Sequence, residues 1–331
     1  MNMDHKKSDE PFLQRQLKKI VINTEQLQTS ISVQKGIYTQ THLWSLLKLV
    51  FLSYSSYIYS RIMSKHHYFS DKYYYVDLFA GSGIGQVVDS DKKELVFGSP
   101  LLIATTRKFS KMFFCESKET SRIALKERLK AIGINENSYE IYGDCNVELN
   151  KIIDQVKDGH SLIFVDPWSM EIEWGTMERL LSLNADIIFN LQSAEIARGV
   201  IQQGKLTNSA RKFFKNPKNI YHIFNNQSNS NKPELILNNY ARDIINTRKE
   251  IDSNKKIVRE TKVYKIKIKG VNSFFYDLLF ITRLTSNKSP WLMGLAVAAK
   301  NIDNIKPKTV DLALEILSGK QQTLNSNLIS G

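Results

Sequence analysis

The chain has 331 residues, of which 42% are hydrophobic and 24% charged, with a formal net charge of +13. This length and apolar content can fill one large core, which argues against a disordered chain. The two cysteines, Cys115 and Cys145, exclude a disulfide framework or a zinc site built from cysteines alone. The positive charge favours a polyanionic partner such as nucleic acid, although a Lys- and Asn-rich composition bias gives the same charge.

The N-terminal part of the sequence predicts neither a leader peptide nor a membrane anchor. Residues 1–16 are polar and charged, and the apolar stretch 43–63 is interrupted by Lys48 and Arg61. Together with the low cysteine content, this favours a cytoplasmic protein without a membrane span. Residues 1–36 are predicted to be a flexible lead-in, and residues 41–64 a long amphipathic helix.

From residue 72 onward, apolar strand-like runs alternate with helical segments. This alternation is typical of βαβ units, and it predicts an α/β fold with a doubly wound, mostly parallel sheet covered on both faces. Ser99 is expected to cap a helix that begins at Pro100. The strands are expected at 73–79, 111–115, 139–142, 161–165 and 186–190, and further helices at 118–131, 146–156 and 174–183.

The C-terminal half departs from this alternation. Residues 196–260 are more polar and predict a helical insertion, with an Asn- and Ser-rich loop at 225–232. Two final strands at 263–268 and 274–282 and a helix at 292–299 are expected to follow. We therefore predict one domain over residues 37–318, with an N-terminal helical extension, and a flexible tail over 319–331.

The first expected strand ends in a Gly-rich turn after Asp77, with glycines at 81, 83 and 85. Glycine lets the backbone approach a ligand closely because no Cβ intervenes. A dinucleotide fingerprint would need glycine at Gln86, and a P-loop would need a Gly-Lys-Ser/Thr sequence. The turn therefore predicts a nucleotide-type ligand of another kind, or a turn that binds nothing.

Polar residues also follow the second and third expected strands. Glu116 can accept hydrogen bonds from ribose hydroxyls, or it can be a solvated surface residue. Asp144 can contact an adenine amine, or it can cap the next helix, as Asn146 also can.

The sequence Asp166-Pro167-Trp168 follows the fourth expected strand, at the switch point where doubly wound sheets bind ligands. Asp166 is a hydrogen-bond acceptor, and Trp168 offers a face for stacking a base or else packs as a core aromatic. This segment can orient an amine nucleophile. Lys48 is expected near the mouth of the same site if its helix crosses the sheet edge.

With these motifs the chain resembles the three-Cys-motif partner protein family, a branch of class I S-adenosylmethionine-dependent methyltransferases. The resemblance covers about residues 40–300, and its family name refers to a partner encoded nearby in the genome. It implies a seven-stranded sheet of the class I type and S-adenosylmethionine as the methyl donor. The resembling residues are 44–49, 76–83, 98–100, Glu116, 143–145, 164–168, 275–283 and Trp291.

The resemblance also implies roles for individual residues. Asp166-Pro167-Trp168 is similar to the Asp-Pro-Pro-Tyr/Phe motif of enzymes that methylate amines in nucleic acids, although the second proline is missing and Trp168 replaces the family's usual Phe. These three residues are the expected catalytic group, with Lys48 and Trp168 binding the acceptor. The expected donor-binding residues are Asp77, Phe79, Ala80, Gly81, Ser82, Gly83, Glu116 (ribose), Asp144 (adenine), Cys145 and Asp166.

Two basic segments, residues 205–218 and 255–269, can contact the phosphates of DNA or RNA. Lys265, Lys267 and Lys269 alternate with isoleucines, so one face of their strand is expected to be cationic, as it also would be in a solvated edge strand. The six histidines show no metal-ligand spacing, and no metal is expected.

The sequence therefore predicts a methyltransferase that acts on an amine of a nucleic-acid base or nucleotide. Two alternatives stay open. One is a catalytically silent protein of the same fold that serves as a nucleic-acid-binding or anti-phage defence subunit. The other is a methyltransferase that acts on a small molecule or a protein.

Overall fold

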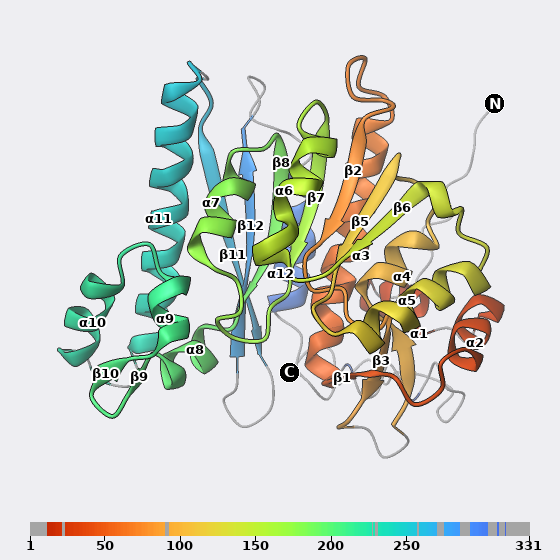
Figure 1. The fold of residues 1–331 in the computed structure, drawn as a ribbon, viewed down its shortest axis with the longest axis horizontal. Helices are drawn as coiled ribbons and strands as arrows, with labels where there is room; N and C mark the ends of the chain where they lie inside the picture. The colour runs from red at the N-terminus through yellow and green to blue at the C-terminus, as the bar shows by residue number, and fades with distance from the viewer. Residues whose placement is uncertain are drawn as a thin grey trace.

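A computed structural model describes residues 12–21, 24–89, 93–226, 228, 231–256, 258–269, 275–284, 292–303, 310 and 315. Its centre is a seven-stranded sheet with the order β6-β5-β2-β7-β8-β12-β11 (Figure 1). Five of its strands correspond to the strands predicted in the alternating region, and the other two, β11 and β12, follow the helical insertion. Their bounds are β2 (Tyr73–Asp77), β5 (Lys111–Cys115), β6 (Tyr139–Tyr142), β7 (His160–Val165), β8 (Ala185–Leu191), β11 (Thr261–Lys269) and β12 (Phe275–Arg283).

Strands β2, β5, β6, β7 and β8 are parallel, whereas β12 runs antiparallel between β8 and β11. Counted along the chain, the order across the sheet is third, second, first, fourth, fifth, seventh and sixth. This order with a reversed seventh strand is that of class I methyltransferases, and the predicted fold class is confirmed. The order reverses between β2 and β7, so the ligand crevice of such a sheet is expected beyond their carboxyl ends.

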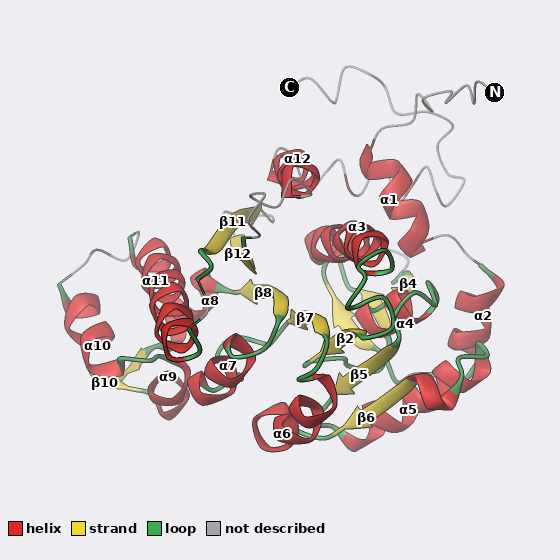
Figure 2. Ribbon diagram, turned by 90° about the horizontal axis from the view of Figure 1, so that it is seen from above, coloured by secondary structure: helices red, strands yellow, loops and turns green. Residues whose placement is uncertain are grey.

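Two layers of helices cover the sheet, and each layer has its own apolar cluster (Figure 2). Because both faces are covered, the central strand β8 is buried at all seven positions. One layer contains α3 (Leu46–Met63), α4 (Ser99–Ala104), α5 (Glu119–Ala131) and α12 (Leu292–Asp303). The other contains α6 (Cys145–Val156), α7 (Trp174–Leu181) and α11 (Lys232–Asn254).

Two N-terminal helices correct the prediction of a flexible lead-in. Helices α1 (Phe12–Val21) and α2 (Glu25–Ser32) bury Leu17, Ile20 and Leu27 in the cluster around α3. Residues 1–11, the predicted tail at 319–331 and Trp291 lie outside the described residues.

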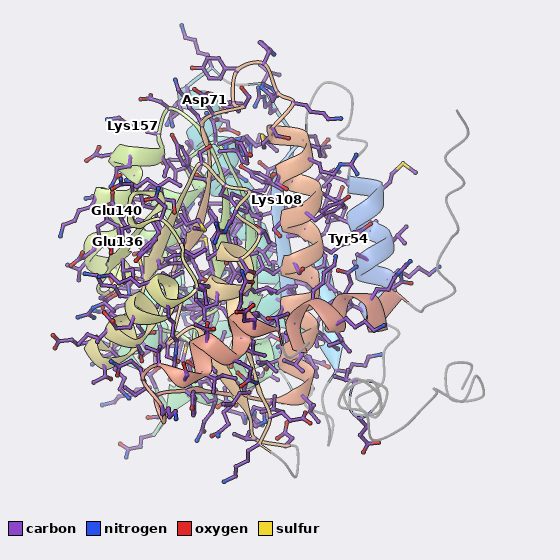
Figure 3. All side chains as sticks on the ribbon, turned by 90° about the vertical axis from the view of Figure 1, so that its right-hand side faces the viewer. Tyr54, Asp71, Lys108, Glu136, Glu140 and Lys157 are labelled. Atoms are coloured by element: carbon purple, nitrogen blue, oxygen red, sulfur yellow. The ribbon has the colours of Figure 1, made fainter. Side chains whose placement is uncertain are left out.

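The predicted helix at 41–64 begins later than expected. Helix α3 starts at Leu46 after a 3-10 turn, η1 (Leu43–Ser45). Its outer side packs against α12, where a Cβ on Gly294 would lie 3.3 Å from Ile58 and 3.8 Å from the Tyr54 hydroxyl (Figure 3).

A small second sheet beside the Gly-rich turn was not predicted. Strand β1 (Thr39–Thr41) pairs in parallel with β3 (Ile84–Val87), which forms a hairpin with β4 (Leu95–Phe97). The next helix, α4, is capped by Gly98, so the predicted cap Ser99 is instead its first residue. The short turn η2 (Glu136–Ser138) precedes β6.

The insertion is mostly helical, as predicted. It contains a short hairpin of β9 (Ile201–Gln202) and β10 (Lys205–Leu206) between helices; residues 227, 229 and 230 of the predicted loop lie outside the described part. Its helices are α8 (Ser193–Gly199), α9 (Asn208–Phe213), α10 (Pro217–Asn225) and α11. Among the described residues, no helix combines the length and the apolar character that a membrane span needs.

Candidate active site

A cavity of about 1100 Å³ opens at the carboxyl ends of the parallel strands. Residues that follow β2, β5, β6, β7 and β8 all contribute to its wall, as expected for a crevice at the switch point. Most of the predicted site residues are brought together here: Lys48, Phe79, Ala80, Gly81, Gly83, Glu116, Asp144, Cys145, Asp166, Pro167 and Trp168. Two predicted residues, Asp77 and Ser82, do not line the cavity.

Asp77 lies beneath the turn, where the structure shows a positioning role for it, and its predicted direct contact with a ligand stays a prediction. Its side chain is fully buried; Oδ2 accepts a hydrogen bond from the Tyr75 hydroxyl at 3.0 Å, and Oδ1 accepts one from the Phe79 amide at 3.3 Å. Burial raises the pKa of Asp77 to about 7, although hydrogen bonds from Ser99 and Tyr75 favour the charged form. Asp77 therefore holds the start of the turn in place.

The turn itself needs glycine at two positions. Gly81 and Gly83 have φ values of +61° and +84°, in the left-handed region that other residues rarely adopt. A Cβ on Gly81 would lie 2.7 Å from Thr39 Oγ1, and one on Gly83 would lie 2.9 Å from Leu101 Cγ. The buried Ser82 turns inward, where its hydroxyl donates to the Ile84 carbonyl at 3.2 Å. The turn is therefore packed tightly from behind while Gly81 and Gly83 face the cavity.

Arg128 supports the turn from α5, and it was not identified from the sequence. Its fully buried guanidinium donates to the carbonyl oxygens of Ser82 at 2.7 Å, Gln34 at 3.0 Å and Ser30 at 3.2 Å. Burial lowers the pKa of Arg128 to about 10. Arg128 thus ties α2 and the segment after it to the Gly-rich turn. In the sequence it looks like one more cation on a charged helix.

The polar residues after β5 and β6 are held by local hydrogen bonds. Glu116 Oε1 accepts from the Lys118 amide at 2.7 Å, which fixes the carboxylate at the cavity wall. Asp144 caps α6 by accepting from the Asn146 amide at 2.8 Å, so the capping alternative is confirmed for Asp144. Asn146 instead donates to the Glu171 carbonyl at 2.9 Å. Contact of Asp144 with an adenine stays a prediction.

Asp166 lies at the centre of a polar cluster. Lys48 Nζ, from α3, is 2.8 Å from Oδ2 and 3.0 Å from Oδ1 of Asp166, so Lys48 reaches the site as predicted. Asn190 Nδ2 donates to Asp166 Oδ1 at 2.7 Å, because the pairing of Val165 with Phe189 places the two residues side by side. Three of the carboxylate's roughly four acceptor positions are thus in use.

Asn190 was not identified from the sequence, where it appeared only as the end of an apolar strand. It is 2% exposed and lines the cavity, and its Oδ1 has no donor among the described residues. The neighbouring Pro167 carbonyl already accepts from Gln192 Nε2 at 3.0 Å.

Trp168 is not a core aromatic, because 67% of its surface is exposed at the cavity. Its amide donates to Glu171 Oε2 at 2.8 Å, and Ser169 follows with a φ of +63°. These two features turn the chain sharply after Pro167. Trp168 is therefore exposed at the same cavity that Asp166 lines.

The charge of the cavity differs from that of the whole chain. Although the net charge of the chain is +13, carboxylates outnumber Lys and Arg side chains in the cavity wall. The wall therefore favours a ligand with positive charge. The carboxylates are Glu116, Asp144, Asp166, Glu171, Glu173 and Glu195, and the cations are Lys48, Lys118, Arg198 and Lys212.

The two predicted basic segments lie in different surroundings. From residues 205–218, Lys212 lines the cavity and pairs with Glu173 at 2.8 Å. On β11, Lys265, Lys267 and Lys269 are exposed while Ile266 and Ile268 are buried, so the predicted cationic face is confirmed. Because β11 runs in the direction of β8, its end at Lys269 lies at the same sheet edge as the cavity.

Neither a protein-family model nor a curated protein sequence matches this chain. Solved structures resemble it weakly. Trm5b from Pyrococcus abyssi matches at 13% identity with a TM-score of 0.30, over 63% of this chain and 43% of Trm5b, so this chain spans less than half of that protein.

Two further solved structures match at similar levels. TYW2 from M. jannaschii, in complex with AdoMet, matches at 12% identity with a TM-score of 0.35, over 69% of this chain and 74% of TYW2. An rRNA methylase from Streptococcus thermophilus matches at 10% identity with a TM-score of 0.34, over 70% of this chain and 95% of the methylase. Likeness at this level assigns neither a ligand nor a substrate to this chain.

Proposed function

We propose that the chain binds S-adenosylmethionine in the cavity and transfers its methyl group to an amine of a nucleic-acid base. The observation that carries this proposal is the convergence of independently predicted residues from separate strand ends on one cavity. The turn at Gly81 and Gly83, Glu116, Asp144 and Asp166 all meet there. In a doubly wound sheet this is where a nucleoside-containing ligand is expected.

The cavity residues fit S-adenosylmethionine in both shape and charge. Gly81 and Gly83 let the backbone approach the ligand, and Glu116 can accept hydrogen bonds from ribose hydroxyls. Asp144 and Cys145 both line the cavity, where the Asp144 carboxylate can contact the adenine. The excess of carboxylates in the wall suits a ligand that carries a sulfonium and an ammonium group. A volume of about 1100 Å³ leaves room for an acceptor as well.

Methyl transfer requires mainly orientation of the two reactants. The acceptor nitrogen forms a bond to the methyl carbon while the carbon–sulfur bond breaks, and the sulfur keeps its electron pair. The products are S-adenosylhomocysteine and a methylated amine, which releases its proton to water in the open cavity. The chain supplies position, because Lys48 and Asn190 fix Asp166 at the centre of the site.

Two features support a nucleic-acid base as the acceptor. Trp168 exposes a flat face beside Asp166, on which a base can stack. The rim and the neighbouring β11 edge carry Arg198, Lys212, Lys267 and Lys269, which can contact phosphates. A protein partner encoded nearby, as implied by the family resemblance, belongs to this proposal, whereas a role in anti-phage defence belongs to the catalytically silent alternative.

The experiment that tests the proposal supplies purified protein with methyl-labelled S-adenosylmethionine and separate pools of DNA, RNA and protein. We expect label in DNA or RNA, and none with the variant D166A. Label confined to the protein pool would favour a protein methyltransferase and contradict the nucleic-acid acceptor. Donor binding without label in any pool would contradict the nucleic-acid acceptor and leave the catalytically silent protein and the small-molecule methyltransferase as the alternatives.

A further inference from the structure

We propose that Asn190 accepts a hydrogen bond from the amine that is methylated, and so selects acceptors that carry an N–H group. This inference rests on the proposed methyl transfer and adds a specificity-determining residue to it. Asn190 is the penultimate residue of β8, where that strand reaches the cavity. Asn190 lines the cavity although only 2% of the residue is exposed.

The orientation of the Asn190 amide is set by its neighbour. Asn190 Nδ2 lies 2.7 Å from Asp166 Oδ1, and a carboxylate offers only acceptors. A rotated amide would place its oxygen against the carboxylate, which Lys48 holds at 2.8 Å. The nitrogen must therefore face Asp166, and the oxygen faces away from it.

Among the acceptors around Asp166, the Asn190 oxygen is the one that no described residue satisfies. By contrast, Asp166 already accepts hydrogen bonds from Lys48 and Asn190, and the Pro167 carbonyl already accepts one from Gln192, so each of these acceptors is partly satisfied. A buried acceptor without a donor is unfavourable, so a ligand that brings a donor to Asn190 gains affinity.

The chemistry of the acceptor follows from this geometry. A primary amine can give one N–H to Asn190 Oδ1 and still direct its lone pair at the methyl carbon. A tertiary amine or a carbonyl oxygen brings no donor and would leave the buried oxygen unpaired. Sites of this kind discriminate strongly against ligands that lack the required N–H. The acceptor class is therefore a primary exocyclic amine of a base, which adenine and cytosine oligonucleotides can probe.

The test measures binding of short single-stranded oligonucleotides to protein saturated with S-adenosylhomocysteine. One oligonucleotide carries a central adenine and the other a central N6,N6-dimethyladenine; a second pair carries cytosine and N4,N4-dimethylcytosine. For the wild-type protein we expect the amine to bind about tenfold more tightly than its dimethyl form in at least one pair, since tenfold corresponds to about 1.4 kcal/mol.

The variant N190L retains a similar volume without the acceptor, and we expect it to bind both members of that pair within about twofold. The matched control N184L makes the same substitution at an exposed asparagine just before β8, outside the cavity wall, and is expected to keep the wild-type preference. A preference retained in N190L would overturn the inference.

The wild-type comparison also decides the question if N190L does not fold. A wild-type protein that binds S-adenosylhomocysteine but shows no preference, as when the oxygen holds water only, would overturn the role of Asn190. Failure to bind any of the oligonucleotides would overturn the acceptor class. Failure of the folded protein to bind S-adenosylhomocysteine would instead refute the proposed function.

Discussion

Replacing Gly83 by alanine should destabilise the protein through two separable effects. Gly83 has a φ of +84°, and a left-handed conformation costs an alanine roughly 1–2 kcal/mol. The new Cβ would also lie 2.9 Å from both Leu101 Cγ and Leu125 Cδ1. Overpacking of this kind costs roughly 1–3 kcal/mol. We therefore expect G83A to lose about 2–5 kcal/mol in free energy of unfolding.

Gly36 offers a matched control, because it also has a φ of +84° but no atom lies within 4 Å of the position that a Cβ would take there. The variant G36A should therefore show the backbone cost without the overlap, about 1–2 kcal/mol. Both variants lose the same flexibility in the unfolded chain, so that effect cancels in the comparison. Urea denaturation of the three proteins gives the free energies. If G83A were no less stable than G36A, the tight packing behind the turn would be refuted.

Three further predictions concern the same site. Burial raises the pKa of Asp77 to about 7 from its usual 3.8, so the folded state binds an extra proton and the free energy of unfolding should fall as pH rises from about 4 to 7. In D77N this fall should be smaller than in the wild type, by at most about 4 kcal/mol, when denaturation is measured across that pH range. An equal fall in both proteins would contradict the raised pKa. R128M should remove the donor from the buried carbonyl oxygens of Ser30 and Ser82, and hydrogen exchange should accelerate in α2; unchanged protection would speak against the tie. W168A should have a free energy of unfolding within about 0.5 kcal/mol of the wild-type value, because Trp168 is 67% exposed. Its binding of single-stranded oligonucleotides, measured by fluorescence anisotropy, should nevertheless be weaker by roughly 1–3 kcal/mol. Unchanged binding would exclude stacking on Trp168.

The central sheet could be predicted from the sequence because its strands are short apolar runs between polar breaks. Strands β5 and β6 have the predicted bounds, and β8 extends one residue beyond the prediction at each end. The small sheet could not be predicted, since β1, β3 and β4 have only three or four residues and too little periodicity to recognise. Helices α1 and α2 were missed for a related reason, because their few apolar residues become meaningful only when α3 and α5 cover them.

The site was predictable where residue type and strand position coincide. Glu116, Asp144 and Asp166 lie within two residues of the ends of their strands, and the parallel sheet brings their positions to one edge. Asn190 and Arg128 depend instead on contacts across the fold, with Asp166 and with the backbone around Ser82. Such contacts leave no signal in a local pattern.

The relation between Asp77 and its turn shows the same limit. The position of Asp77 at the end of β2 was predicted, but its depth was not, because depth depends on how Tyr75, Phe79 and Ser99 close over the carboxylate. The structure therefore shows which of the predicted residues line the cavity and which, like Asp77, lie beneath it.

Calorimetric titration with S-adenosylhomocysteine tests the central claim most directly. We predict one binding site, and a loss of affinity in E116A of roughly 1–3 kcal/mol because the ribose loses a charged acceptor. The control E119A removes an exposed carboxylate from the first turn of α5, outside the cavity wall, and should bind like wild type. Folded wild-type protein that gives no binding heat and no thermal stabilisation by the ligand would contradict the account.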